Sequence, residues 1–173
     1  MTYNSLDELT ERMLDLLFEN AEQVSLVAAK AAEAALKRRV FNEGKAADGT
    51  MIGQYSTKEA RFGESAFAVR GAFRPDAGKR SMLLTGGYAE LRRLNGRQAN
   101  YVDLQYTGSL IRSITTQATG GAHAVVISTN DDAEVARHNE ARFGKVVFEA
   151  GENELQAIEQ AAIFEIERLL NQL

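Results

Sequence analysis

LDELTERMLDLLFENAEQVSLVAAKAAEAALKRRVFN, residues 6–42, contains neither glycine nor proline. Its apolar residues recur at steps of three and four, which predicts a helix. Ser5, followed three residues later by Glu8, has the pattern of a capping box. The run Lys37-Arg38-Arg39 lies where the helix dipole favours cations. We therefore predict a long helix over about residues 5–41, either continuous and about 50 Å long or bent or broken near Asn20.

The next region is rich in glycine and lacks a regular apolar period. Asp48-Gly49 has the composition of a turn, and residues 62–87 hold several further glycines and Pro75. We predict a long irregular loop region over residues 42–87, a feature that is usually functional in a small protein. Its three phenylalanines need burial, and another subunit is one candidate partner; they are Phe62, Phe67 and Phe73. A short helix is expected over residues 88–94, ended by Asn95-Gly96.

The second half of the chain predicts a small sheet and two more helices. Residues 101–106 favour a short strand, and residues 109–129 favour a hairpin around Gly120-Gly121. Asp131-Asp132 is expected to cap a helix that ends at Phe143, and residues 145–148 are an edge-strand candidate. A closing amphipathic helix is predicted over about residues 152–171. Five apolar residues form the stripe expected to face the sheet: Leu155, Ile158, Ala162, Ile166 and Leu169.

These elements predict the α+β class in a single domain over residues 1–173. A small antiparallel β-sheet would be packed by the long N-terminal helix and the shorter C-terminal helix, and the irregular loop would be an insertion.

Charge is segregated along the chain. Residues 1–36 carry a net charge of −5, residues 58–112 carry +5, and residues 131–173 carry −6. Such segregation can steer head-to-tail contacts between copies, or it can reflect ordinary solvated faces. The whole chain has a net charge of −4, so we expect no bulk attraction to nucleic acid or to anionic membranes.

Residue types argue against an enzyme, a metal or a cofactor. The chain has no cysteine and two histidines, which excludes a disulfide framework, thiolate zinc sites and thiol nucleophiles. Gly71 to Lys79 lacks the spacing of a phosphate-binding loop, and Glu134 with His138 makes half a metal site at most. His123 is expected to be a solvated residue at a strand edge. No apolar run is long enough to cross a bilayer, and the N-terminus lacks the features of a signal peptide, so we expect an intracellular origin.

A series of short motifs follows in a recognisable order. Arg38-Arg39-Val40-Phe41 precedes Asp48-Gly49-Thr50 and Ile52-Gly53-Gln54-Tyr55-Ser56, and then comes Leu83-Leu84-Thr85-Gly86. Leu104 to Ile114 (LQYTGSLIRSI) and Ala136 to Gly144 (ARHNEARFG) complete the series. Over residues 36–150 this order resembles the tailed-phage virion morphogenesis family, the tail-completion or neck proteins at the head–tail joint. Thr107 to Ile114 is the strongest part.

The chain departs from the family pattern in two places. Ile52 stands near the position where the family has a tryptophan, and the insertion over residues 62–103 is longer than expected. The position within the joint therefore stays open between tail terminator, head-completion stopper and adaptor.

The resemblance implies a structural virion protein, assembled in the bacterial host cytoplasm, that forms a closed homo-oligomeric ring around the DNA channel. Its partners would be other copies of itself and the neighbouring head-completion or portal and tail-tube proteins, with genomic DNA only passing through and no membrane involved. The expected interface residues are Asp48, Gly49, Tyr55, Phe62, Phe67, Phe73, Arg92, Arg93 and Arg97. The expected structural motif is Thr107, Gly108, Leu110, Arg112 and Ser113, with Arg112 and Ser113 on opposite faces of a strand.

Two further expectations concern charge. A basic channel would retain DNA, so the acidic segment 131–173 is the better candidate for the lumen, with much of its glutamate set turned outward. The basic residues Arg70, Arg74, Arg92, Arg93 and Arg97 would then face neighbouring protein. The alternative function is a nucleic-acid-binding accessory protein that uses the basic region 58–112.

Overall fold

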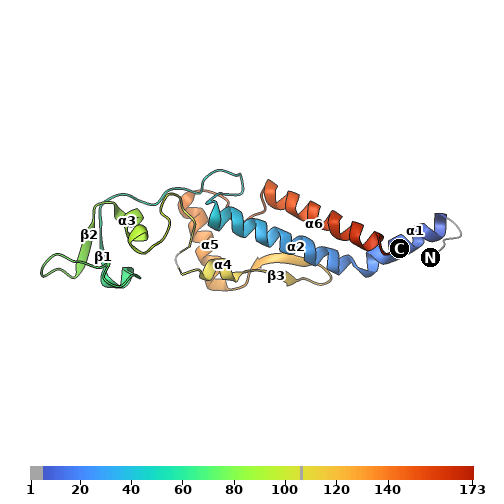
Figure 1. Cartoon of the computed structure of the whole chain (residues 1–173), viewed down its shortest axis with the longest axis horizontal. Helices are drawn as coiled ribbons and strands as arrows, with labels where there is room; N and C mark the ends of the chain where they lie inside the picture. Colours follow the sequence, from blue (N-terminus) through green and yellow to red (C-terminus); the bar gives the residue numbers. More distant parts are fainter. Residues whose placement is uncertain (1–5, 106) are drawn as a thin grey trace. The chain divides into compact units, whose positions relative to one another are not determined.

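A computed structural model describes residues 6–105 and 107–173, and it divides the chain into two compact units. The helical unit comprises the chain up to Thr50 and from Leu104 onward, and the inserted unit is Met51–Asp103. Helices and two small antiparallel sheets make up the described residues, so the α+β class is confirmed (Figure 1). The predicted single domain thus contains two compact units.

The long N-terminal helix is broken where the sequence allowed it. Helix α1 (Leu6–Glu19) is followed by α2 (Ala21–Lys37), and Asn20 between them leaves helical geometry at φ −109° and ψ 11°. The Asn20 side-chain amide donates to the Leu16 carbonyl oxygen at 2.8 Å and so competes with the helical ladder. A turn of π-helix, η1 (Arg38–Asn42), continues α2. The predicted cap, Ser5, lies outside the described residues.

Helix α2 is the centre of the helical unit. Helix α6 (Glu152–Leu170) packs along it, and the hairpin of β3 (Ile114–Ala118) and β4 (His123–Ile127) also packs on it (Figure 1). Small residues of α2, including the buried Ala29 and Ala32, allow this close approach. Helix α6 therefore lies against α2, and the prediction that its apolar stripe faces the sheet is wrong. Leu155 of that stripe is 58% exposed.

The hairpin is confirmed over its central part, with Ile114 paired to Ile127 and Ala118 paired to His123. Residues 109–113 form a short helix, α4 (Ser109–Ser113), in place of the predicted strand. Gly108 precedes it at φ +77°, a left-handed conformation that glycine adopts without strain. Leu110 and Ser113 are both buried because three-residue spacing puts them on one face of a helix.

Two predicted strands are absent from the described residues. Neither residues 101–105 nor residues 145–148 are in a strand, and Tyr106 lies outside the described residues. Helix α5 (Asn130–Phe143) forms as predicted and ends at Gly144, which has φ +63°. Its N-cap is Thr129, whose hydroxyl accepts from the Asp132 N–H at 3.2 Å, whereas the sequence pointed to Asp131-Asp132 as the cap.

The inserted unit contains regular structure where the sequence predicted an irregular loop. Strand β1 (Ala60–Gly63) pairs antiparallel with β2 (Ser81–Leu84), a 3₁₀ turn spans Glu64–Ala66, and α3 covers Gly87–Leu94 as predicted. Six residues form the apolar core of this unit: Ile52, Leu84, Ala89, Leu91, Ala99 and Val102. The strands were missed because each is only four residues long and their partners lie some twenty residues apart.

Candidate functional site

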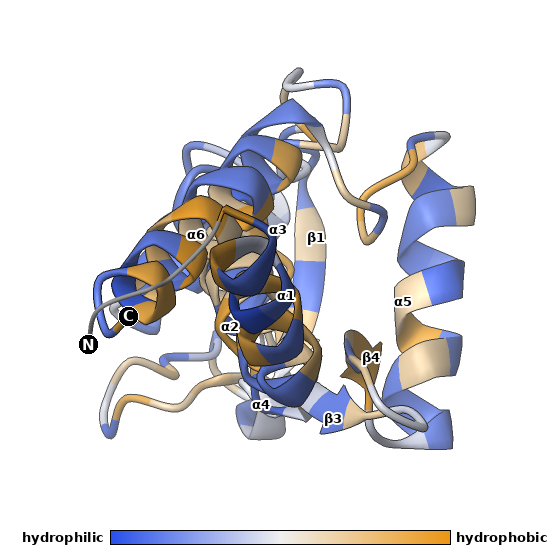
Figure 2. Ribbon diagram, turned by 90° about the vertical axis from the view of Figure 1, so that its right-hand side faces the viewer, coloured by the Kyte–Doolittle hydropathy of each residue, from blue (hydrophilic) through white to orange (hydrophobic). Residues whose placement is uncertain are grey.

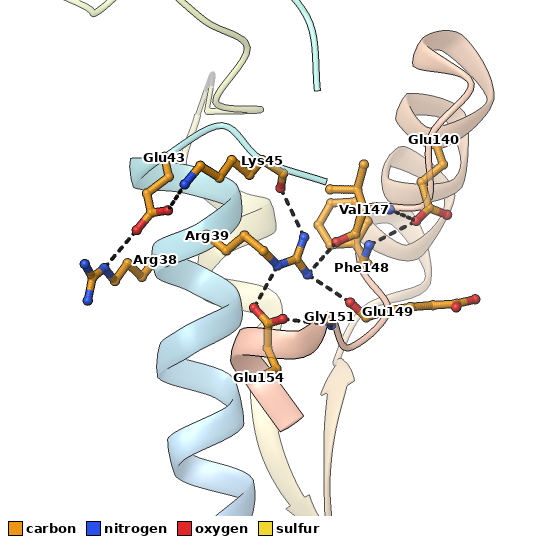
Figure 3. A network of polar contacts seen from close by, with 10 residues as sticks. All are labelled: Arg38, Arg39, Glu43, Lys45, Glu140, Val147, Phe148, Glu149, Gly151 and Glu154. Carbon is orange, nitrogen blue, oxygen red and sulfur yellow. Dashed lines mark hydrogen bonds and ion pairs between the residues drawn. The ribbon is translucent and has the colours of Figure 1, made fainter. Parts of the chain in front are cut away.

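A buried arginine joins four segments of the helical unit (Figure 3). Arg39, on η1, is 2% exposed, and its Nε donates to Glu154 Oε1 of α6 at 2.7 Å. Its Nη2 donates to the carbonyl oxygens of Val147 and Glu149 at 3.0 and 2.9 Å, and its Nη1 donates to that of Lys45 at 3.1 Å. The planar guanidinium thus fixes the loop after η1 and the segment before α6 at the same time.

Two carboxylates complete this arrangement. Glu154 Oε2 accepts from the Gly151 N–H at 2.8 Å and so satisfies the first turn of α6. Glu140 of α5 accepts from the N–H groups of Val147 and Phe148 at 2.7 and 3.0 Å (Figure 3). The sequence assigned Arg39 only to the end of a helix and expected much of the glutamate set of residues 131–173 to face outward. Glu154 does not follow that expectation, since it is 1% exposed.

The Asp48-Gly49 turn is exposed and well ordered by its own contacts. Asp48 Oδ1 accepts from the N–H and the hydroxyl of Thr50 at 2.9 and 2.6 Å, and these bonds lower the pKa of the carboxyl group. Gly49 has φ +77°, and the Ala47 N–H donates to the Val146 carbonyl oxygen at 2.9 Å. The turn is therefore exposed and fixed by its own hydrogen bonds, and its place in a subunit interface stays a prediction.

Arg92 and Tyr55 belong to the interior of the inserted unit. Arg92 is 3% exposed, and its Nη2 donates to both oxygens of Asp103 at 2.9 and 2.8 Å. Its guanidinium lies 4.3 Å from the centre of the Tyr55 ring, and the Tyr55 hydroxyl donates to Asp103 Oδ1 at 2.7 Å. Burial and this hydrogen bond raise the pKa of Tyr55. The prediction that Arg92 faces a neighbouring protein is therefore wrong.

The three phenylalanines pack within their own unit and stay half-buried. Phe62 lies 6.4 Å from Tyr88, and Phe67 lies 5.3 Å from Phe73, measured between ring centres. Arg93 is exposed, and Arg97 is half-buried.

The motif around Thr107 is a structural joint. Ser109 and Thr129 both donate to Asp132 Oδ2, at 3.1 and 2.7 Å, and so connect α4 with the start of α5. The bond from Thr129 is the main cause of a lowered Asp132 pKa. The Thr107 hydroxyl accepts from the Ser109 N–H at 3.2 Å. Arg112 is exposed, and both it and the buried Ser113 lie on a helix, so the prediction of opposite strand faces is wrong.

A cavity of about 420 Å³ lies between α2, β4 and α6. Its lining includes Ala29, Val125, Phe148 and Ile158, and also His123. His123 is half-buried, and its Nδ1 is buried without a hydrogen-bond partner among the described residues, which corrects the expectation of a solvated edge histidine. The apolar lining offers packing surface but no arrangement of reactive groups.

A scan against protein-family models, a search of curated proteins and a search of solved structures each return no match. Within residues 6–105 and 107–173, no three histidine, aspartate or glutamate side chains gather closely enough to hold a metal ion. In the same part of the chain, no helix is long and apolar enough to cross a membrane.

Proposed function

We propose that this chain is a structural subunit of the head–tail joint of a tailed phage, which assembles into a closed homo-oligomeric ring around the DNA channel. The order of motifs over residues 36–150 supports the phage assignment. Two unlike surfaces support the assembly part of the proposal, and each carries charged side chains that form no ion pair within residues 6–105 and 107–173.

The helical unit supplies an acidic surface with exposed apolar residues. Hydrophilic and hydrophobic positions alternate along α1 and α6 (Figure 2). Six large apolar side chains on these helices are well exposed: Leu6, Leu14, Phe18, Leu155, Ile163 and Phe164. Exposed apolar residues grouped on one element are typical of protein–protein contact sites.

The inserted unit supplies the opposite charge. Met51–Asp103 contains nine basic and five acidic residues, for a net charge of +4. Among the described residues, the side chains of Arg70, Lys79, Arg80 and Arg93 form no ion pair. Contact between unlike surfaces of successive copies is heterologous, and such contacts generate a ring when the rotation closes.

The acidic surface also suits a channel for DNA. Glu152, Glu159 and Glu167 of α6 are exposed, whereas Glu154 and Glu165 are buried against Arg39 and Arg168. The lumen candidates on α6 are therefore the first three, because phosphates would be repelled there and would pass without binding.

Negative-stain electron microscopy and light scattering of the purified chain test this proposal. We expect closed rings of one copy number that form without DNA. Deletion of residues 64–80, which connect β1 to β2, should leave the helical unit folded and abolish rings. A chain that stays monomeric at every concentration, alone and with candidate neck proteins, would refute the proposal.

The exposed basic residues of the inserted unit also favour a second candidate, a nucleic-acid-binding accessory protein. Binding of a short DNA duplex should then weaken steeply as salt is raised. A ring that forms without DNA and does not bind the duplex even at low salt would exclude this candidate.

A further inference from the structure

Helix α1 leaves an apolar face largely uncovered in the single chain. None of its residues is buried, although Leu9, Met13, Leu16 and Leu17 are half-covered. Leu6, Leu14 and Phe18 are 77%, 51% and 79% exposed. An amphipathic helix gains most of its stability from packing its apolar face against a partner, and α6 and α2 cover only part of that face of α1.

The polar face of α1 restricts what that partner can be. The helix carries five carboxylates and one arginine, for a net charge of −4. Glu11, Asp15 and Glu19 follow one another at four-residue steps and form no ion pair among the described residues. Pairing of α1 with another α1 would bring two such surfaces together, and like charges in contact are unfavourable.

The segment 67–83 of the inserted unit has the complementary chemistry. Phe67 and Phe73 form a half-buried aromatic pair, and Val69 beside them is 47% exposed. The Arg74 N–H contacts Met82 Sδ at 3.3 Å, which folds this segment back onto β2. Four exposed cations lie in the same segment: Arg70, Arg74, Lys79 and Arg80. We call these residues, with the aromatic pair and Val69, the basic surface.

We propose that α1 of one copy docks on the basic surface of the next copy, with Leu14 and Phe18 against the aromatic pair and the acidic face against the four cations. This inference rests on the proposed function, because it names the contact that joins successive subunits of the ring. One copy contributes a helix and the next a receiving surface, so the contact repeats around the ring.

Single-cysteine variants test the contact directly, because the native chain has no cysteine. Full-length Leu14→Cys and Val69→Cys chains are mixed and treated with a short bismaleimide. We expect the mixed dimer to form at least about tenfold faster than the Leu14→Cys homodimer, given the opposite charges of the two surfaces. Val135→Cys on α5 mixed with Val69→Cys is the matched control, since Val135 is also exposed, at 47%, but lies outside the proposed contact.

Charge exchange provides a second test that does not depend on cross-linking. One variant carries Glu11→Lys, Asp15→Lys and Glu19→Lys, and the other carries Arg70→Glu, Arg74→Glu and Arg80→Glu. Each alone should lose assembly by at least about tenfold in concentration, and an equimolar mixture should regain it because the exchanged surfaces attract again. Glu152→Lys, Glu159→Lys and Glu167→Lys change the net charge equally on α6 and should leave assembly intact.

Several outcomes would overturn the inference. Three results would each refute the α1 contact: cross-linking in the control as fast as in the test pair, no cross-link at all, and no rescue of assembly in the mixture. Charge reversal of the basic surface that abolishes DNA binding and leaves assembly intact would refute it as well. Rings of the wild-type chain without the cross-link would leave the proposed function standing. The cross-link within open chains that never close would support the contact and refute the ring.

Discussion

Replacement of Arg39 by methionine should lower the free energy of unfolding far more than replacement of any exposed arginine. Methionine keeps most of the apolar stem and removes the guanidinium. The carboxylate of Glu154, which is only 1% exposed, then has no cation beside it. Breaking a buried ion pair from one side costs about 3–5 kcal/mol. The three carbonyl oxygens bound by Arg39 also lose their donor. We expect a loss of about 4 kcal/mol, or a fall in Tm of about 10 °C.

The neighbouring Arg38 is the matched control. Its side chain is 77% exposed and pairs with Glu43 at 3.0 Å, so Arg38→Met should cost less than about 1 kcal/mol. The sharpest test is the double variant Arg39→Met/Glu154→Gln. Glutamine removes the stranded charge and its carbonyl can still accept from the Gly151 N–H, so the double variant should be more stable than Arg39→Met alone.

Urea denaturation followed by far-UV circular dichroism measures these differences, with unchanged m-values as the condition for comparing free energies of unfolding. Arg39→Met and Arg38→Met of equal stability would refute the reasoning. So would a double variant that is less stable than Arg39→Met, because the penalty would then not arise from an unpaired carboxylate.

Three further predictions concern other parts of the chain. Because the pKa of Asp132 is lowered by the Thr129 hydroxyl, folding stability should fall as the pH drops below about 4, and Asp132→Asn should flatten that fall in acid melting curves. Because burial raises the pKa of Tyr55, the native wild type and Tyr55→Phe should show equal tyrosinate absorbance steps near pH 10, and denatured wild type should show one more ionisation than denatured Tyr55→Phe. Gly87→Ala should destabilise the protein much more than Gly49→Ala, because a Cβ at Gly87 would overlap the Lys58 carbonyl oxygen. At Gly49 no atom lies within 4 Å of such a Cβ, so the only cost is that of the left-handed backbone, about 1 kcal/mol. Equal melting temperatures of the two glycine variants would contradict the last prediction.

Signals that act within a few residues made several elements predictable. Gly144 after α5 and Asn95-Gly96 after α3 end their helices as expected, and the closing helix α6 occupies Glu152–Leu170. The Gly120-Gly121 turn lies between β3 and β4. In each case the backbone conformation at the boundary depends on the residue located there, so one sequence is enough to find it.

Residues 109–113 show where a local pattern is ambiguous. Isoleucine and threonine favour a strand, and that preference holds for Ile114–Ala118. Upstream, Gly108 at φ +77° turns the chain, and burial of Leu110 and Ser113 selects a helix. A short apolar run cannot be assigned to helix or strand by period alone, because both bury a similar number of side chains.

By itself the sequence determined the α+β class, the C-terminal ends of α3 and α5, and the separation of charge between the ends and the middle of the chain, and it left a break near Asn20 as one of two alternatives. Only the tertiary structure decided which charges are free for a partner. Arg39 and Glu154 are 115 residues apart, and Arg92 was indistinguishable in the sequence from its exposed neighbour Arg93. A charged side chain is buried only where a distant segment brings the opposite charge and the hydrogen-bond acceptors to it. Contacts between distant segments produce no periodic pattern in the sequence, so they cannot be predicted from it.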